Sequence, residues 1–131
     1  MVFRWDTRIR FIDTDASGRI HYTAMFRYFE SAELEFFREI GVLHRHPTTA
    51  FPRVHVECDY SGAIHYDDLL TIELAIRKIG KSSVRFEFLV LKNGAEVAKG
   101  AVVVACIDRQ AQRAVPIPDN IREKLLPYVR V

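Results

Sequence analysis

One segment of the chain, residues 22–40, has the periodicity of a long helix. Its apolar side chains recur at helical spacing and form a single stripe, made of Met25, Phe29, Ala32, Phe36 and Ile40. The exception is Glu33, which projects among these apolar side chains, and Gly41 is a typical helix stop. A helix with one apolar stripe must bury it against another element. The rest of the chain therefore has to supply a matching apolar face.

Most of the remaining chain alternates between apolar and polar residues, which is the pattern of half-buried strands. The alternating segments are residues 3–12, 53–60, 70–77, 84–90 and 97–107. Asn93-Gly94 is a strong hairpin signal between the last two. The run AVVVACI near residue 104 is apolar on both sides and indicates an interior strand. Residues 119–126 predict a short closing helix.

This order of elements predicts an α+β fold. The 131 residues fit one domain, residues 1–131, which is long enough to bury a core without disulfides. The four later strands are expected to form an antiparallel meander, with the first strand added to that sheet and the helix across its concave face. Apolar surface that one helix leaves uncovered would favour dimerisation.

Charge and cysteine usage narrow the class of protein. The 19 basic and 17 acidic residues are well mixed, so no nucleic-acid track is expected. Cys58 and Cys106 fall inside strand patterns, which indicates reduced core thiols and a cytoplasmic protein. The N-terminus is charged from its fourth residue, unlike a signal peptide. No apolar segment is long enough for a membrane helix, so no stable membrane association is expected.

Motifs appear where the first strand passes into the helix. The sequence DTDASG occupies residues 13–18, IHY residues 20–22 and YFE residues 28–30. YDDLLTIE follows at residues 66–73 and GKSS at residues 80–83. Together with the order of elements, these motifs resemble the hotdog-fold acyl-CoA thioesterases, in particular the 4-hydroxybenzoyl-CoA thioesterase family. The resemblance implies a five-stranded antiparallel sheet wrapped around one long central helix.

The resemblance also assigns roles to residues at the start of the helix. The second acid of the motif is catalytic in that family, as base or nucleophile, and it falls on Asp15. The backbone N–H that polarises the thioester carbonyl falls on Tyr22. His21, before it, departs from the Asn, Tyr or Trp common there, and is a candidate for orienting the substrate or a water as well as for a structural role.

This chemistry agrees with what the residues can do. Thioester hydrolysis needs an activated oxygen nucleophile and donors for the developing oxyanion, which a carboxylate and unpaired helix N–H groups supply. The chain has no G-x-S-x-G elbow, so Asp15 is the best nucleophile or base, although it could merely cap a turn. Asp13 is interpreted as a turn residue. Glu33 and Glu30 are the fallback acids, because some hotdog enzymes carry the catalytic acid on this helix.

Substrate contacts are expected at a second place. Lys81, Ser82 and Ser83 are candidates for binding the phosphates or ribose of CoA, although a solvated turn has the same composition. The side chains of Arg85 and Arg109 are weaker candidates. The pattern His44-x-His46 lacks a third convincing ligand, so no metal is predicted. No cofactor is expected either, since CoA is part of the substrate.

Three functions remain open from the sequence. The first is an acyl-CoA thioesterase that acts on an acyl- or aryl-CoA substrate. The second is a thioesterase for acyl carrier protein, which would prefer an exposed basic surface. The third is a non-catalytic acyl-CoA binding module. A hotdog dehydratase is disfavoured because its expected Asp–His pair has no clear counterpart. The resemblance implies a homodimer or homotetramer, with the active site at the subunit interface.

Overall fold

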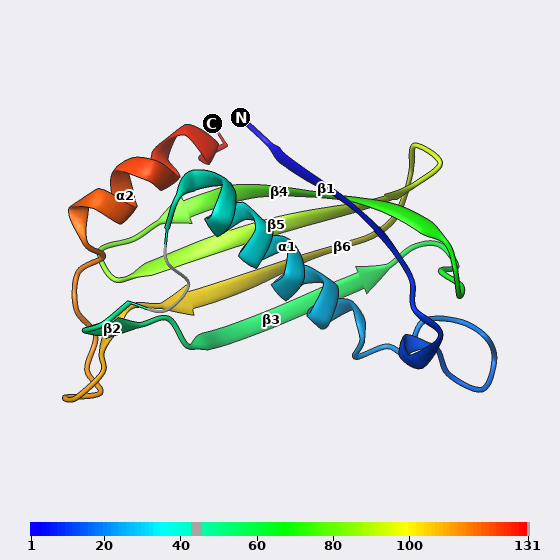
Figure 1. Cartoon of the computed structure of the whole chain (residues 1–131), viewed down its shortest axis with the longest axis horizontal. Helices are drawn as coiled ribbons and strands as arrows, with labels where there is room; N and C mark the ends of the chain where they lie inside the picture. Colours follow the sequence, from blue (N-terminus) through cyan, green and yellow to red (C-terminus); the bar gives the residue numbers. More distant parts are fainter. Residues whose placement is uncertain (43–45, 131) are drawn as a thin grey trace.

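The computed structural model describes residues 1–42 and 46–130, and Figure 1 shows one helix lying across a curved sheet. The larger elements are β1 (Phe3–Arg8), α1 (Met25–Ile40), β3 (Arg53–Tyr60), β4 (Leu69–Ile79), β5 (Ser83–Lys92), β6 (Ala95–Ala105) and α2 (Asp119–Leu125). The short ones are the 3-10 turns η1 (Phe11–Asp13) and η2 (Leu126–Tyr128) and the paired strands β2 (Thr49–Ala50) and β7 (Ile107–Asp108).

The predicted five-stranded antiparallel sheet is confirmed, with the strand order β1-β4-β5-β6-β3. The hairpin at Asn93-Gly94 is also confirmed, and both residues have positive φ angles, 53° and 79°. The predicted four-strand meander is wrong, because β3 pairs with β6 and not with β4. The reason is that β1 already occupies the outer edge of β4, from Phe3 opposite Leu74 to Arg8 opposite Leu69. β3 is added at the far side of the sheet, along the edge of β6.

The long helix begins later than its pattern predicts, so α1 has 16 residues and starts at Met25 instead of near Tyr22. Residues 21–24 form a turn, in which the N–H of Ala24 donates to the carbonyl of His21 at 2.8 Å. The predicted stop at Gly41 is confirmed, since Gly41 is left-handed with φ 72° and its N–H donates to the carbonyl of Arg38.

The first strand is shorter than predicted. β1 ends at Arg8, and the chain turns into η1, so the side chain of Phe11 is 74% exposed instead of sharing the buried face. The turn is favoured because the N–H of Arg10 donates to the hydroxyl of Tyr28 on α1, 3.0 Å away. Ile9, which follows the last residue of β1, donates its N–H to the carbonyl of Asp68 in the loop that precedes β4.

The core forms where the stripe of α1 meets the concave face of the sheet. Met25, Phe29, Ala32 and Phe36 are buried, and the ring of Phe29 stacks on Phe88 of β5 at 4.4 Å. The inward face of β3 is less buried, since the side chains of Val56 and Tyr60 remain 46% and 41% exposed. Among the described residues, no helix has the length and apolar character needed to cross a membrane.

Gly100 of β6 permits this close approach of helix and sheet. A Cβ atom there would lie 2.4 Å from the carbonyl oxygen of Glu57 and 2.6 Å from the ring of Phe29. Gly100→Ala is therefore expected to lower the free energy of unfolding by about 1–3 kcal/mol, measured by urea denaturation. Lys99→Ala, at an exposed neighbouring position, serves as the control. Equal urea midpoints for Gly100→Ala and wild type would contradict this packing.

Candidate active site

The segment between η1 and α1 is a tight hairpin and not an open loop. The N–H of Asp15 donates to the carbonyl of Arg19 at 2.8 Å, and the N–H of Gly18 donates back to the carbonyl of Asp15 at 3.0 Å. Gly18 has a φ of 84°, which suits glycine. The hairpin is tied to the segment before β4, because the N–H of Ile20 donates to the carbonyl of Ile64. Asp15 is thus held on a defined backbone.

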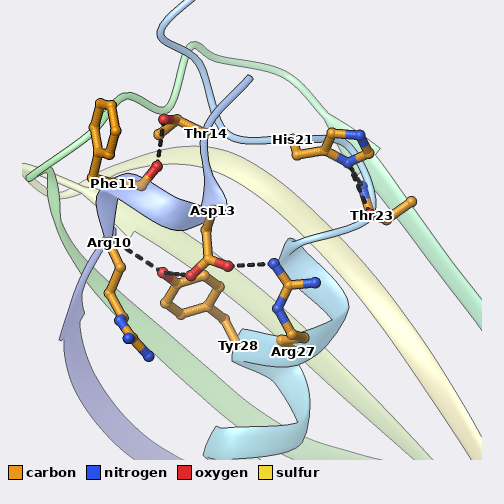
Figure 2. A network of polar contacts seen from close by, with 8 residues as sticks. All are labelled: Arg10, Phe11, Asp13, Thr14, His21, Thr23, Arg27 and Tyr28. Carbon is orange, nitrogen blue, oxygen red and sulfur yellow. Dashed lines mark hydrogen bonds and ion pairs between the residues drawn. The ribbon is translucent and has the colours of Figure 1, made fainter. Parts of the chain in front are cut away.

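Asp13 anchors this hairpin to the helix, as Figure 2 shows. Its buried carboxylate accepts hydrogen bonds from the hydroxyl of Tyr28, at 2.6 Å, and from the guanidinium of Arg27. Burial alone would raise the pKa of Asp13, but the hydrogen bonds from Arg27 and Tyr28 outweigh it and the pKa is lowered. The carbonyl of Asp13 accepts the N–H of His21 at 2.8 Å. The geometry gives Asp13 a structural role.

Asp15 is the exposed acid of the pair. Its Oδ1 atom accepts a hydrogen bond from the hydroxyl of Ser17, at 2.5 Å, and another from the N–H of Ser17, at 2.8 Å. These two bonds lower the pKa of Asp15, with the hydroxyl contributing most. The carboxylate is therefore ionised near neutral pH, the form that a base or a nucleophile needs. Asp15 does not line any of three hollows found among the described residues.

His21 and Tyr22 form the entrance to the helix. Nδ1 of His21 lies 2.8 Å from the hydroxyl of Thr23 and accepts a hydrogen bond from the backbone N–H of Thr23 at 3.2 Å. The imidazole ring lies apart from the side chains that bind the Asp13 carboxylate (Figure 2). Tyr22 stacks on His21 with ring centroids 4.8 Å apart and is 72% exposed. Among the hydrogen bonds of the described residues, none uses the N–H of Tyr22.

Tyr60 makes a hydrogen bond near the candidate site that the sequence did not reveal. Its hydroxyl donates to the carbonyl of Tyr22 and so ties the entrance of the helix to β3. Burial and the neighbouring Cys58 raise the pKa of Tyr60, which keeps the hydroxyl protonated as a donor. Alternation in residues 53–60 places Tyr60 on the inward face, but no local pattern indicates its partner 38 residues away.

The predicted substrate contacts lie far from Asp15 in this chain. Lys81 and Ser82 lie in the turn between β4 and β5, and Ser83 is the first residue of β5, at the opposite end of the sheet from the hairpin (Figure 1). The 11 residues of β4 separate the two ends, a length of roughly 35 Å. The carbonyls of Lys81 and Ser82 accept the N–H groups of Ile117 and Cys106, so the backbone of the turn is already engaged.

Glu33 is buried, as its place in the stripe predicts, with 1% of its surface exposed. Nη2 of Arg53 lies 3.4 Å from Oε1 of Glu33, and this oxygen has no hydrogen-bond partner among the described residues. Burial raises the pKa of Glu33 to about 7, with Arg53 opposing the rise and Glu30 adding to it. The other fallback acid, Glu30, lies on the exposed side of α1.

The remaining candidates have structural partners. Arg85 pairs with Glu57 at 3.1 Å, and Nε of Arg109 donates to the carbonyl of His46. His44 lies outside the described residues, and the described residues hold no group of three or more side chains suited to a metal. Cys58 and Cys106 are both free, and burial raises the pKa of each thiol, to about 11 for Cys58. Neither is an activated thiol nucleophile.

Comparison with known proteins places the chain in a family context. A family model described as the thioesterase-like superfamily matches residues 9–125. A putative esterase from Aquifex aeolicus is 30% identical over 128 residues, which cover 95% of this chain and 98% of that protein. A protein from Haemophilus influenzae named acyl-CoA thioesterase YbgC is 27% identical, with 92% of this chain and 91% of that protein covered.

Solved structures share the arrangement of elements. The structure of a protein described as a predicted thioesterase from Bacillus stearothermophilus superposes with a TM-score of 0.87 at 27% identity. The match covers 99% of this chain and 98% of that chain. The similarity therefore extends over both the hairpin around Asp15 and the turn at Lys81.

Proposed function

This chain belongs to the thioesterase-like superfamily, and from that membership we propose that it is an acyl-CoA thioesterase, which hydrolyses an acyl- or aryl-CoA thioester to the free acid and CoA. The observation that carries the proposal is that two groups suited to this reaction lie on the segment that leads into α1. One is the ionised, exposed carboxylate of Asp15, and the other is the N–H of Tyr22, to which the described residues offer no acceptor. Relatives named for CoA-thioester hydrolysis support the same reaction.

In one route, Asp15 removes a proton from water as the water oxygen attacks the thioester carbon. In the other, the Asp15 carboxylate attacks that carbon itself, and after CoA has left, water hydrolyses the resulting mixed anhydride to the free acid and the Asp15 carboxylate. The N–H of Tyr22 donates to the oxygen that becomes negative, a contact typically worth roughly 2.7–4 kcal/mol in the transition state. The carbon–sulfur bond then breaks, and CoA leaves as the thiol after taking up a proton. His21 is proposed to orient the substrate or the water. Water and the thioester are the only reactants, so the reaction needs no cofactor.

A second subunit is part of the proposal. Within one chain, the hairpin around Asp15 and the turn at Lys81 lie at opposite ends of the sheet (Figure 1). β3 is an edge strand of the sheet, and the exposed apolar side chain of Val54 on it favours association with another copy. In a homodimer or homotetramer, Lys81, Ser82 and Ser83 of a neighbouring subunit would be placed to contact the CoA portion bound at Asp15.

The experiment that tests the reaction is a hydrolysis screen. Acyl-CoAs from short aliphatic to aromatic are incubated with the protein, and free CoA thiol is followed over time. At least one thioester is expected to turn over. Saturable binding of acyl-CoA without release of thiol from any substrate would contradict the enzyme and favour a non-catalytic binding module. Side-by-side rates with the same acyl groups on acyl carrier protein decide between the two carriers, and CoA is expected to be preferred because the surface charges are interspersed.

Tyr60→Phe tests whether the N–H of Tyr22 acts on the reacting carbonyl. The substitution removes only the hydroxyl that holds the Tyr22 carbonyl, so the entrance of α1 loses one tether while the ring stays in place. We expect kcat to fall by about fivefold with little change in KM, since the loss of one hydrogen bond is worth about 1 kcal/mol. A rise in KM at unchanged kcat would instead indicate that Tyr60 contributes only to substrate binding.

A further inference from the structure

A cavity of ≈ 240 Å³ opens between the second half of α1 and the helix α2. Its walls are apolar, and its lining includes Leu34, Phe37, Phe51, Phe86, Ile121 and Leu125. We name it the α1–α2 pocket. An engineered cavity of about 150 Å³ with similar walls binds benzene, so this volume suffices for an apolar group larger than one ring. It is smaller than the roughly 300–1,000 Å³ that drug-sized ligands occupy, so it fits part of a substrate and not a whole acyl-CoA.

The charged groups of the α1–α2 pocket are Glu30 and Arg53. Arg53 is directed towards buried Glu33, with Nη2 3.4 Å from Oε1, so its apolar stem rather than its charge is available to a ligand. Glu30 lies on the exposed side of α1. The remaining lining residues are apolar, and burying a polar group among them without a partner would cost free energy. The pocket therefore suits an uncharged, apolar end group.

Partly exposed apolar side chains of β3 lie between the pocket and the entrance of α1. Tyr60 lies at the Tyr22 end of β3 and Arg53 at the pocket end, with Val56 between them on the inward face. Tyr60 and Val56 are 41% and 46% exposed, so a ligand can contact both. Glu30 lies five residues after Met25, the first residue of α1, which is about 7.5 Å along the helix axis, and Tyr22 lies in the turn before Met25. A single aromatic ring attached to the thioester carbon cannot bridge that distance.

We propose that the acyl chain of the substrate runs from the N–H of Tyr22 along the inward face of β3 and places its end in the α1–α2 pocket. The substrate is then a CoA thioester of a medium- or long-chain apolar acyl group, and the pocket selects for chain length. This inference rests on the proposed function, because the carbonyl position at Tyr22 is the origin from which the chain is measured.

The test fills the pocket and measures chain-length preference. Leu34 lines the pocket and is 37% exposed, so Leu34→Trp adds bulk there with little risk to the fold. Glu39→Trp, at an exposed position of the same helix outside the pocket, is the matched control. The values of kcat/KM for butanoyl-, benzoyl- and dodecanoyl-CoA are compared among wild type and the two variants.

Wild type is expected to prefer dodecanoyl-CoA. Leu34→Trp should lower kcat/KM for that substrate by at least about tenfold, since a single methylene in an apolar pocket is worth 10–200-fold, and should leave butanoyl-CoA unchanged. Glu39→Trp should behave as wild type. Turnover of butanoyl- and dodecanoyl-CoA that falls equally, or not at all, in Leu34→Trp would overturn the assignment of the pocket while the thioesterase stands.

Two further measurements keep the inference testable if wild type hydrolyses nothing, which would be the failure of the proposed function. The Kd of S-dodecyl-CoA, a thioether that cannot be hydrolysed, should be at least about tenfold weaker for Leu34→Trp than for Glu39→Trp. Equal Kd values would overturn the proposal. Light scattering gives the mass of each variant, and a change of mass in Leu34→Trp alone would show that this face binds a second copy of the chain, which would also overturn it.

Discussion

Replacing Asp15 with asparagine is expected to lower kcat about a thousandfold with little change in KM, the size typical for loss of a general base. The carbonyl oxygen of asparagine can still accept the N–H and hydroxyl of Ser17, so the hairpin should keep its shape. What the variant loses is the negative charge, and with it the ability to take a proton or to attack the thioester carbon. Steady-state release of free CoA, at several substrate concentrations, gives both constants.

Asp13→Asn is the matched control, because it makes the same chemical change two residues away. Its carboxylate is buried and bonded to Tyr28 and Arg27, so the expected cost is stability and not turnover. The variant should unfold at lower urea concentration while kcat per folded molecule stays close to wild type. Equal rates for wild type and Asp15→Asn would show that another group activates the nucleophile, and Glu30 would be the next acid to replace.

Local patterns were sufficient to predict most of the elements. The stripe from Met25 to Ile40, the stop at Gly41 and the hairpin at Asn93-Gly94 depend on residues close in sequence, and all three are confirmed. The pairing of β3 could not be predicted in this way. It depends on which sheet edge is left free, and that edge is decided by β1, whose Phe3 pairs with Leu74 far along the chain. Alternation also cannot tell whether an inward-facing residue such as Val56 is covered.

The sequence was sufficient to locate the candidate site at the start of the helix, but not to predict which of its side chains are buried or what they contact. The two acids of the motif look alike in sequence, and only the docking of α1 distinguishes the buried Asp13 from the exposed Asp15. The partner of Asp13, Tyr28, is 15 residues away, so no turn signal indicates it. Glu33 was identifiable because an acid interrupts an apolar stripe, and its burial is confirmed. The separation of Lys81 from Asp15 follows from the length of β4, which appears only once the strands are paired.

Glu33→Gln is expected to stabilise the protein at pH 8 by about 3 kcal/mol and by less than about 1 kcal/mol at pH 5. In the folded state the pKa of Glu33 is raised from 4.5 to about 7, so between these values the folded chain holds a proton that the unfolded chain has lost. Stability is therefore full below pH 4.5, falls as pH rises towards 7 and is constant above. Each pKa unit is worth about 1.4 kcal/mol, which gives the size of the loss. Glutamine cannot ionise and avoids it.

Urea denaturation of wild type and Glu33→Gln across this pH range measures the difference, and all other titrating groups cancel because both proteins share them. Glu35→Gln is the matched control, since it makes the same chemical change at a partly exposed acid of the same helix, which pairs with Arg38. Parallel stability curves for wild type and Glu33→Gln would contradict the raised pKa.

The same variant also decides between a structural and a catalytic role for Glu33. Retained CoA release with higher stability at pH 8 would make Glu33 a structural partner of Arg53, whereas a thousandfold loss of kcat, with Asp15→Asn still active, would move the catalytic acid from the hairpin to the helix.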